Sequence, residues 1–110
     1  MSWTISYYSA ALQRDLPGLP ATIQARYVHL TARMMVFGPD LGMPHTRAMG
    51  EGLFELRLKG AGGIARVLYC TLSGRRIVML HAFVKKSEKT PPRELALARR
   101  RMKEIKDAYA

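Results

Sequence analysis

The chain has 110 residues, of which 48% are hydrophobic and 24% charged, and a formal net charge of +10 at pH 7. This length fits one domain, residues 1–110, with one hydrophobic core, and no apolar run approaches the roughly 20 residues that span a bilayer. The lone Cys70 excludes an internal disulfide, three scattered histidines lack zinc-ligand spacing, and MSWTISYY is unlike a secretory signal. We therefore expect a cytoplasmic protein without a metal or cofactor.

The first half of the chain predicts one strand followed by two helices. Residues 3–8 are β-branched and aromatic, which favours a short strand, and residues 9–16 fit a short helix. Residues 20–37 predict a longer helix, because apolar side chains recur every three or four residues. These side chains are Ile23, Tyr27, Leu30, Met34 and Phe37. Gly38 and Pro39 then end the helix.

The second half predicts a cluster of strands. Residues 39–52 form a connection rich in glycine and proline, with a short extended piece at 46–49. Three strands follow, at residues 53–58, 64–72 and 77–84. The last two are nearly continuous apolar runs, which is typical of central strands.

A short turn sets the expected register of the last two strands. Gly74 and Arg75 fit a two-residue type II′ turn, which would pair Ser73 with Arg76. Three pairs then share one sheet face: Arg66 opposite Phe83, Leu68 opposite His81, and Ile64 opposite Lys85. A slip of one residue would scramble these pairs.

A basic helix ends the chain. Thr90 is the expected N-cap before Pro91 and Pro92, and Glu94 lies near the positive helix end. Apolar residues then recur at 3, 4, 3, 4 spacing: Leu95, Ala98, Met102, Ile105 and Tyr109. Strands clustered late among helices predict an α+β domain, in which one antiparallel sheet has its helices packed on one face and the other face partly open.

The positive charge is confined to the second half. Residues 1–55 contain four basic and four acidic side chains, whereas residues 56–110 contain fourteen basic and four acidic ones. A concentrated excess of cations is typical of a protein that binds a polyanion. Nucleic acid is therefore the first candidate partner, and an acidic membrane or protein surface is the second.

Arg66 is the first candidate for a functional side chain. An arginine inside an apolar strand destabilises the fold unless it meets an anion or a partner, so it indicates either a phosphate site or an ion pair with an acid such as Glu55. Lys85 and Lys86, which follow the last strand, are candidates for the same catalytic site or for a solvated strand end. Because they are adjacent, only one of them can face a given site.

Other candidates have equally plain alternatives. Arg57 fits the same site or a cross-strand ion pair, and His81 fits a proton carrier or a hydrogen-bonded core residue. Tyr69 could stack on a base, but its face favours the core. General attraction of RNA phosphates, or a merely solvated surface, is expected for the remaining cations: Arg75, Lys89, Arg93, Arg99, Arg100 and Arg101.

Several strings in the second half resemble a known family. They are GLFELR at 52–57, RVLY at 66–69, LHAFVKK at 80–86 and KTP at 89–91, with Glu94, Ala98 and Arg99. Together they are similar to the HigB-like, phage-associated branch of the RelE/ParE toxin superfamily, over roughly residues 50–103. The resemblance implies a microbial RNase-like fold, with a small curved sheet and a concave basic surface.

The same resemblance implies an activity and its partners. It implies cleavage of messenger RNA in the ribosomal A site, and inhibition by a helix-turn-helix antitoxin. Cleavage without a metal needs a base for the ribose 2′-OH and fixed cations around the phosphorane, for which arginine and a lysine of lowered pKa are suited. A non-catalytic RNA or ribosome binder, and a ParE-like poison of DNA gyrase, remain the alternatives.

Overall fold

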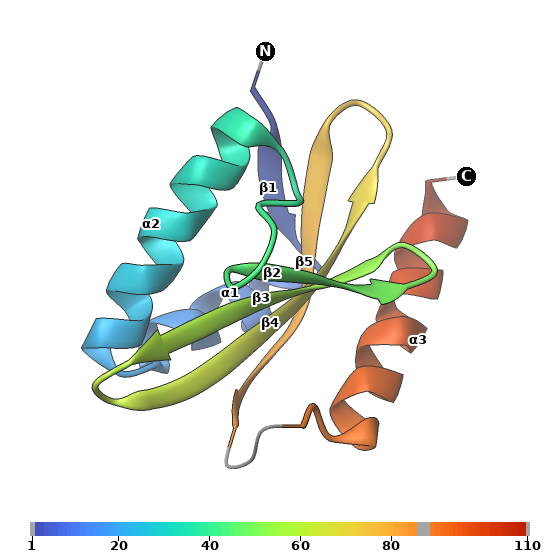
Figure 1. Ribbon diagram of the computed structural model, residues 1–110. Helices are drawn as coiled ribbons and strands as arrows, with labels where there is room; N and C mark the ends of the chain where they lie inside the picture. The colour runs from blue at the N-terminus through green and yellow to red at the C-terminus, as the bar shows by residue number, and fades with distance from the viewer. Residues whose placement is uncertain (1, 86–88, 110) are drawn as a thin grey trace.

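Five strands form one sheet in the part of the chain that the structure describes, residues 2–85 and 89–109 (Figure 1). The structure is a computed structural model. Its elements in chain order are β1 Thr4–Tyr7, α1 Ala10–Asp15, the 3₁₀ turn η1 Leu16–Gly18, α2 Ala21–Phe37, β2 Thr46–Gly50, β3 Leu53–Gly60, β4 Gly63–Leu72, β5 Arg76–Lys85 and α3 Pro92–Ala108. None of these helices is both long and apolar enough to cross a bilayer.

The sheet has the strand order β1-β5-β4-β3-β2. The chain starts at one edge, passes through α1 and α2 to β2 at the other edge, and returns strand by strand through hairpins (Figure 1). The α+β class predicted from the sequence is confirmed. The sheet is mixed rather than purely antiparallel, because the final return brings β5 alongside β1 in the same direction.

Helices cover both faces of the sheet. Along β4, Val67 and Tyr69 pack in a core with α2, while the alternating Leu68 and Cys70 pack in a second core with α3. The sequence predicted all helices on one face, and α3 corrects that prediction. The apolar runs of β4 and β5 are the physical reason, because strands that are apolar on both sides need cover on both sides.

Local sequence explains where the first two helices begin and end. Ser9 caps α1, since its Oγ accepts a hydrogen bond from the backbone N–H of Leu12 at 3.1 Å. The predicted apolar stripe of α2 is buried at Ile23, Leu30 and Met34, and Gly38 ends the helix with φ of 99°.

The β3–β4 turn packs closely against the start of α2. A Cβ on Gly62 would lie 2.6 Å from the Cβ of Pro20, so only glycine fits there. The Gly62 N–H also donates to Oγ1 of Thr22 at 3.2 Å. This contact fixes α2 beside the end of β3.

The β4–β5 register confirms the three predicted pairs but not the predicted turn. Arg66–Phe83, Leu68–His81 and Ile64–Lys85 are all observed. The connecting loop nevertheless has three residues, since Leu72 rather than Ser73 pairs with Arg76. Gly74 and Arg75 have φ of 84° and 58°, whereas a type II′ turn needs positive φ only at its first central residue. A bulge at Leu80 then shifts the register by one and restores the predicted pairs.

Candidate nucleic-acid interface

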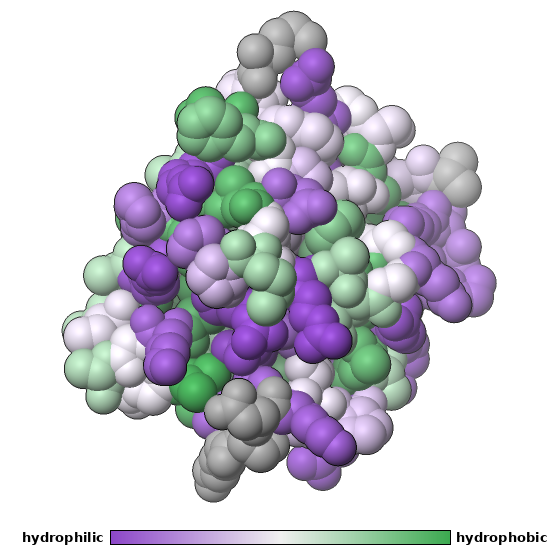
Figure 2. All heavy atoms as spheres, in the orientation of Figure 1, coloured by the Kyte–Doolittle hydropathy of each residue, from purple (hydrophilic) through white to green (hydrophobic). Residues whose placement is uncertain are grey.

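Helix α3 covers only part of its sheet face. The covered part is apolar, with Leu53, Leu68 and Leu80 packed in the core that includes Ala98 and Met102 of the helix. Beyond the helix the same three strands carry charged side chains on the same face. Figure 2 shows these hydrophilic side chains gathered over the middle of the sheet, between α2 and α3.

One buried carboxylate organises the charged part. Glu55 of β3 is 1% exposed, and its Oε1 lies 3.4 Å from Nη1 of Arg57 and 3.4 Å from Nε of Arg66. Its Oε2 accepts a hydrogen bond of 2.5 Å from Oγ1 of Thr90. Thr90 is therefore not the predicted N-cap, and α3 begins after Pro91 without a side-chain cap. Glu55 thus joins three of the strings that resemble the toxin family.

Arg66 is held by both its strand and this acid. It is 4% exposed and lies opposite Arg57 in the register of β3 and β4. Its Nη1 donates a hydrogen bond to the carbonyl of Ala65 at 3.1 Å. The ion pair with Glu55, which was the alternative to a phosphate site, is present. It does not exclude that site, because Arg57, which contacts the same carboxylate, is 24% exposed and can still meet a ligand.

These arginines open into a hollow of about 280 Å³. The size is near the lower end of ligand pockets. Its wall combines the start of α2, the segment before β2, and the ends of β3 and β4. The lining residues are Arg26, Pro44, His45, Arg57, Lys59, Ile64 and Arg66. Among the described residues that line it, the charged ones are all basic, which favours an anion.

His45 is the group, among the described lining residues, that can accept a proton near neutral pH. Burial lowers its pKa below the usual 6.5, and the positive charges of Arg26, Arg33 and His29 lower it further. Its carbonyl accepts a 2.8 Å hydrogen bond from the N–H of Arg57, which fixes it beside the two arginines. His45 and Arg26 could not be predicted as site residues from the sequence, because only the folded chain brings α2 and the Pro-rich connection to the basic strands.

The two lysines at the end of β5 differ in what the structure describes. Lys85 is 7% exposed and opposite Ile64, so it shares the face of Arg66, as predicted, but it does not line the hollow. Lys86 lies outside the described residues.

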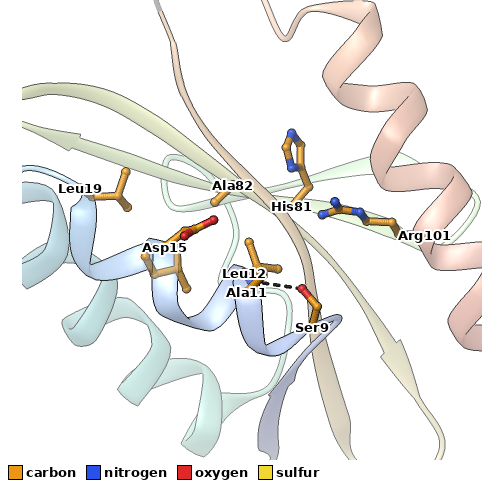
Figure 3. Close-up of a pocket in the computed structure, with 9 residues that line it drawn as sticks. Ser9, Ala11, Leu12, Asp15, Leu19, His81, Ala82 and Arg101 are labelled. Atoms are coloured by element: carbon orange, nitrogen blue, oxygen red, sulfur yellow. Dashed lines mark hydrogen bonds between the residues drawn. The ribbon is translucent and has the colours of Figure 1, made fainter.

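His81 belongs to a different cavity. Its Nε2 contacts Oε2 of Glu94, and its ring stacks on Phe83 with centroids 5.6 Å apart. It lines a cleft of about 220 Å³ where α1 and α3 flank β5; Figure 3 shows Asp15 on the α1 side and Arg101 on the α3 side. His81 is therefore not among the residues that line the hollow with Arg57 and Arg66.

Some cations of α3 donate hydrogen bonds to the sheet, and others are exposed to solvent. Arg99 donates to the carbonyl of Met49 at 2.8 Å, and Arg101 donates to the carbonyl of Leu80 at 2.8 Å. Two further cations of this helix, Arg93 and Arg100, are exposed, and so is Lys89 ahead of it.

Two other predicted contact residues lie apart from the hollow. Arg75 is at the tip of the β4–β5 hairpin, 6.0 Å from the centre of the Trp3 ring. Tyr69 is fully buried, and its hydroxyl donates to the carbonyl of Pro39 at 2.5 Å. Burial raises the pKa of Tyr69, as expected for the core alternative.

Among the residues that the structure describes, no three His, Cys, Asp or Glu side chains gather where they could hold a metal ion.

Comparisons with known proteins agree on the fold. Residues 14–103 match the model of a family described as "Phage derived protein Gp49-like (DUF891)". A mutant of the E. coli toxin RelE in the free state has a TM-score of 0.67 at 8% identity, covering 93% of this chain and 99% of that chain. The RelE–RelB complex from Pyrococcus horikoshii has a TM-score of 0.57 at 16% identity, covering 78% and 98%. No curated protein matches the sequence.

Proposed function

We propose that this chain, which belongs to the family of phage-derived Gp49-like proteins, is the toxin of a toxin–antitoxin pair and cuts messenger RNA without a metal. The family and the RelE-like fold confirm the resemblance to the RelE/ParE superfamily that the sequence predicted. The similar structures support the toxin assignment, because one is a toxin and the other is a complex of RelE with RelB.

The hollow is the observation on which the proposal depends. It places Arg57 and Arg66 together on one carboxylate, and it adds His45 and Lys59 in the same lining. Arginines held in this way are oriented before a ligand arrives, which is what stabilisation of a developing charge requires. An RNA backbone supplies the anion, and its attraction is strengthened by the net charge of +10.

In this proposal a named residue carries out each step of the reaction. His45, neutral because of its lowered pKa, accepts the proton of the ribose 2′-OH as that oxygen attacks the adjacent phosphorus. Arg57 and Arg66 stabilise the phosphorane with their guanidinium forks. The bond from phosphorus to the 5′-oxygen then breaks, and that oxygen takes a proton from Lys59. The products are a 2′,3′-cyclic phosphate and a 5′-hydroxyl.

The remaining basic residues would act by attraction rather than by chemistry. Lys85 adds positive charge on the face of Arg66, and Lys86 follows it in the chain. RNA phosphates around the hollow would be contacted by a wider set of cations: Arg75, Lys89, Arg93, Arg99 and Arg100. We propose the ribosomal A site as the place of cleavage and a helix-turn-helix antitoxin as the inhibitor.

Purified protein added to programmed ribosomes tests the activity, with primer extension on the message as the readout. We expect cuts in the A-site codon that persist in EDTA, and binding to ribosomes that weakens steeply with added salt. An intact message with ribosomes still bound would support the non-catalytic binder instead. An intact message together with inhibited gyrase would support the ParE-like alternative.

A further inference from the structure

Helix α2 carries a second apolar stripe that the fold does not bury. The stripe recurs at 4, 3, 4, 3 spacing, so its members lie on one side of the helix. They are Ala21, Ala25, Val28, Ala32 and Met35, and all are exposed. Two further apolar residues, Val36 and Phe37, extend the surface at the end of the helix, and are 64% and 72% exposed. Hydrophobic surface is visible over this end of α2 in Figure 2.

A groove continues this stripe toward α1. Its volume is about 180 Å³, and it lies between α2 and the segment that contains η1. Val28 belongs to both the stripe and the groove, where its neighbours include Leu16, Pro17 and Tyr27. The three alanines of the stripe allow a close approach of another backbone, and the groove can receive one large apolar side chain of a partner.

The two sides of the stripe differ in charge. One side carries a row of basic residues at helical spacing, Arg26, His29 and Arg33, while the other carries the uncharged Gln24 and Thr31. Helix α2 contains no acidic residue. A surface that is apolar along its middle and basic along one edge fits a partner that is apolar with an acidic edge.

The basic row also borders the hollow. Arg26 is part of the lining, and the charges of Arg33 and His29 act on His45. A partner whose acids pair with this row would therefore place negative charge at the rim of the hollow, where an RNA phosphate would otherwise enter.

We propose that the outer stripe of α2, with its basic row, docks an amphipathic helix of the antitoxin that is apolar on one face and acidic along one edge. This inference rests on the proposed function and adds where and how the inhibitor binds. Docking and inhibition become one event, because the acids that pair with Arg26 and Arg33 exclude the RNA backbone from the hollow.

Two other occupants fit the same surface less well. An RNA would pair with the basic row but would leave the apolar stripe exposed. A second copy of this chain would bring another net charge of +10 and another α2 without an acid, so like charges would meet along the row.

Val28→Asp tests the apolar part with purified cognate antitoxin as the probe. We expect the dissociation constant to rise at least tenfold, because a charge would replace an apolar contact at the centre of the interface. Val84→Asp is the matched control, since it changes a valine that is also exposed, at 52%, on β5, and we expect less than a threefold change. Arg33→Gln tests the charged edge and should weaken the salt dependence of binding.

Hydrogen exchange of the complex gives a second measurement. Slower exchange of residues 21–37 with antitoxin bound is expected, as is growth arrest by Val28→Asp even when antitoxin is co-expressed. The proposal is overturned if antitoxin fails to bind, binds Val28→Asp as tightly as wild type, or leaves α2 unprotected. Self-association of the free toxin that Val28→Asp abolishes would assign the surface to a second copy. Growth arrest by wild type without antitoxin tests the proposed function separately.

Discussion

The two halves of the sheet face that carries α3 are built from the same strands and differ in what covers them. Under the helix, Leu53, Leu68 and Leu80 form a dry core. Beyond the helix, β3 and β4 present Arg57 and Arg66 around Glu55 instead. The difference shows that the charged groups lie where the cover of α3 ends, and that the two that are buried there, Glu55 and Arg66, are paired with each other.

Replacing Arg66 with alanine should have the largest effect on the open half. In the proposed mechanism Arg66 is one of two guanidinium groups that stabilise the phosphorane, so we expect the cleavage rate to fall about 10³-fold. The fold should persist, because Glu55 keeps its contacts with Arg57 and Thr90. Primer extension and a thermal melt measure the two results. Arg14→Ala, at an exposed position in the last turn of α1, is the control, and a folded Arg66→Ala that cleaves normally would remove Arg66 from the chemistry.

Replacing Leu80 with alanine should break the covered half without touching the chemistry. The side chain is fully buried against α3, so truncation should lower the free energy of unfolding by about 2–5 kcal/mol. Urea denaturation measures this loss, and the folded fraction should cleave within about threefold of wild type. If Leu80→Ala lost cleavage while its stability was unchanged, the covered half of the sheet face would itself contribute to cleavage.

The pH dependence of cleavage tests whether His45 is the base in the open half of the sheet face. Because the pKa of His45 is lowered, its neutral form persists as the pH falls to 6.5, and the rate should decline only below that value. His45→Gln should remove this acidic limb and slow cleavage about 10²-fold. A limb at or above pH 6.5 in the wild type would assign the base to another group.

His81→Gln should have the smallest effect. His81 contacts Glu94 in the cleft beside α1 and α3 and does not line the hollow with Arg57 and Arg66, so we expect less than about a threefold change in cleavage rate. A loss of a hundredfold or more in the same primer-extension assay would move the chemistry to that cleft.

Much of the fold could be predicted from local pattern. The strands and helices follow from apolar periodicity, and the β-branched content of β4 and β5 marks them as central. Which face a helix covers depends on contacts far apart in the sequence, and so the position of α3 was not predictable from its own apolar stripe. The parallel pairing of β1 is equally non-local.

The candidate site could be predicted only in part, because some of its residues are brought together by contacts far apart in the sequence. Arg66 is conspicuous because it interrupts an apolar strand, and Glu55 was already its expected partner. His45 carries no such signal, since it lies in an irregular connection. Its pKa is lowered first by burial and then by the charges of α2 residues that precede it by twelve residues or more. A pKa that depends on distant neighbours is a property of the folded chain.

The bulge at Leu80 changes which face of the sheet the odd-numbered side chains of β5 occupy. Before it, Ile77 and Met79 face α2; after it, Phe83 and Lys85 face the same way as Arg66, although all four numbers are odd. A single extra residue thus lets one half of β5 direct its odd-numbered side chains into the α2 core and the other half direct them to the face of Arg66. Deleting it would send Lys85 to the wrong side without altering any side chain of the site.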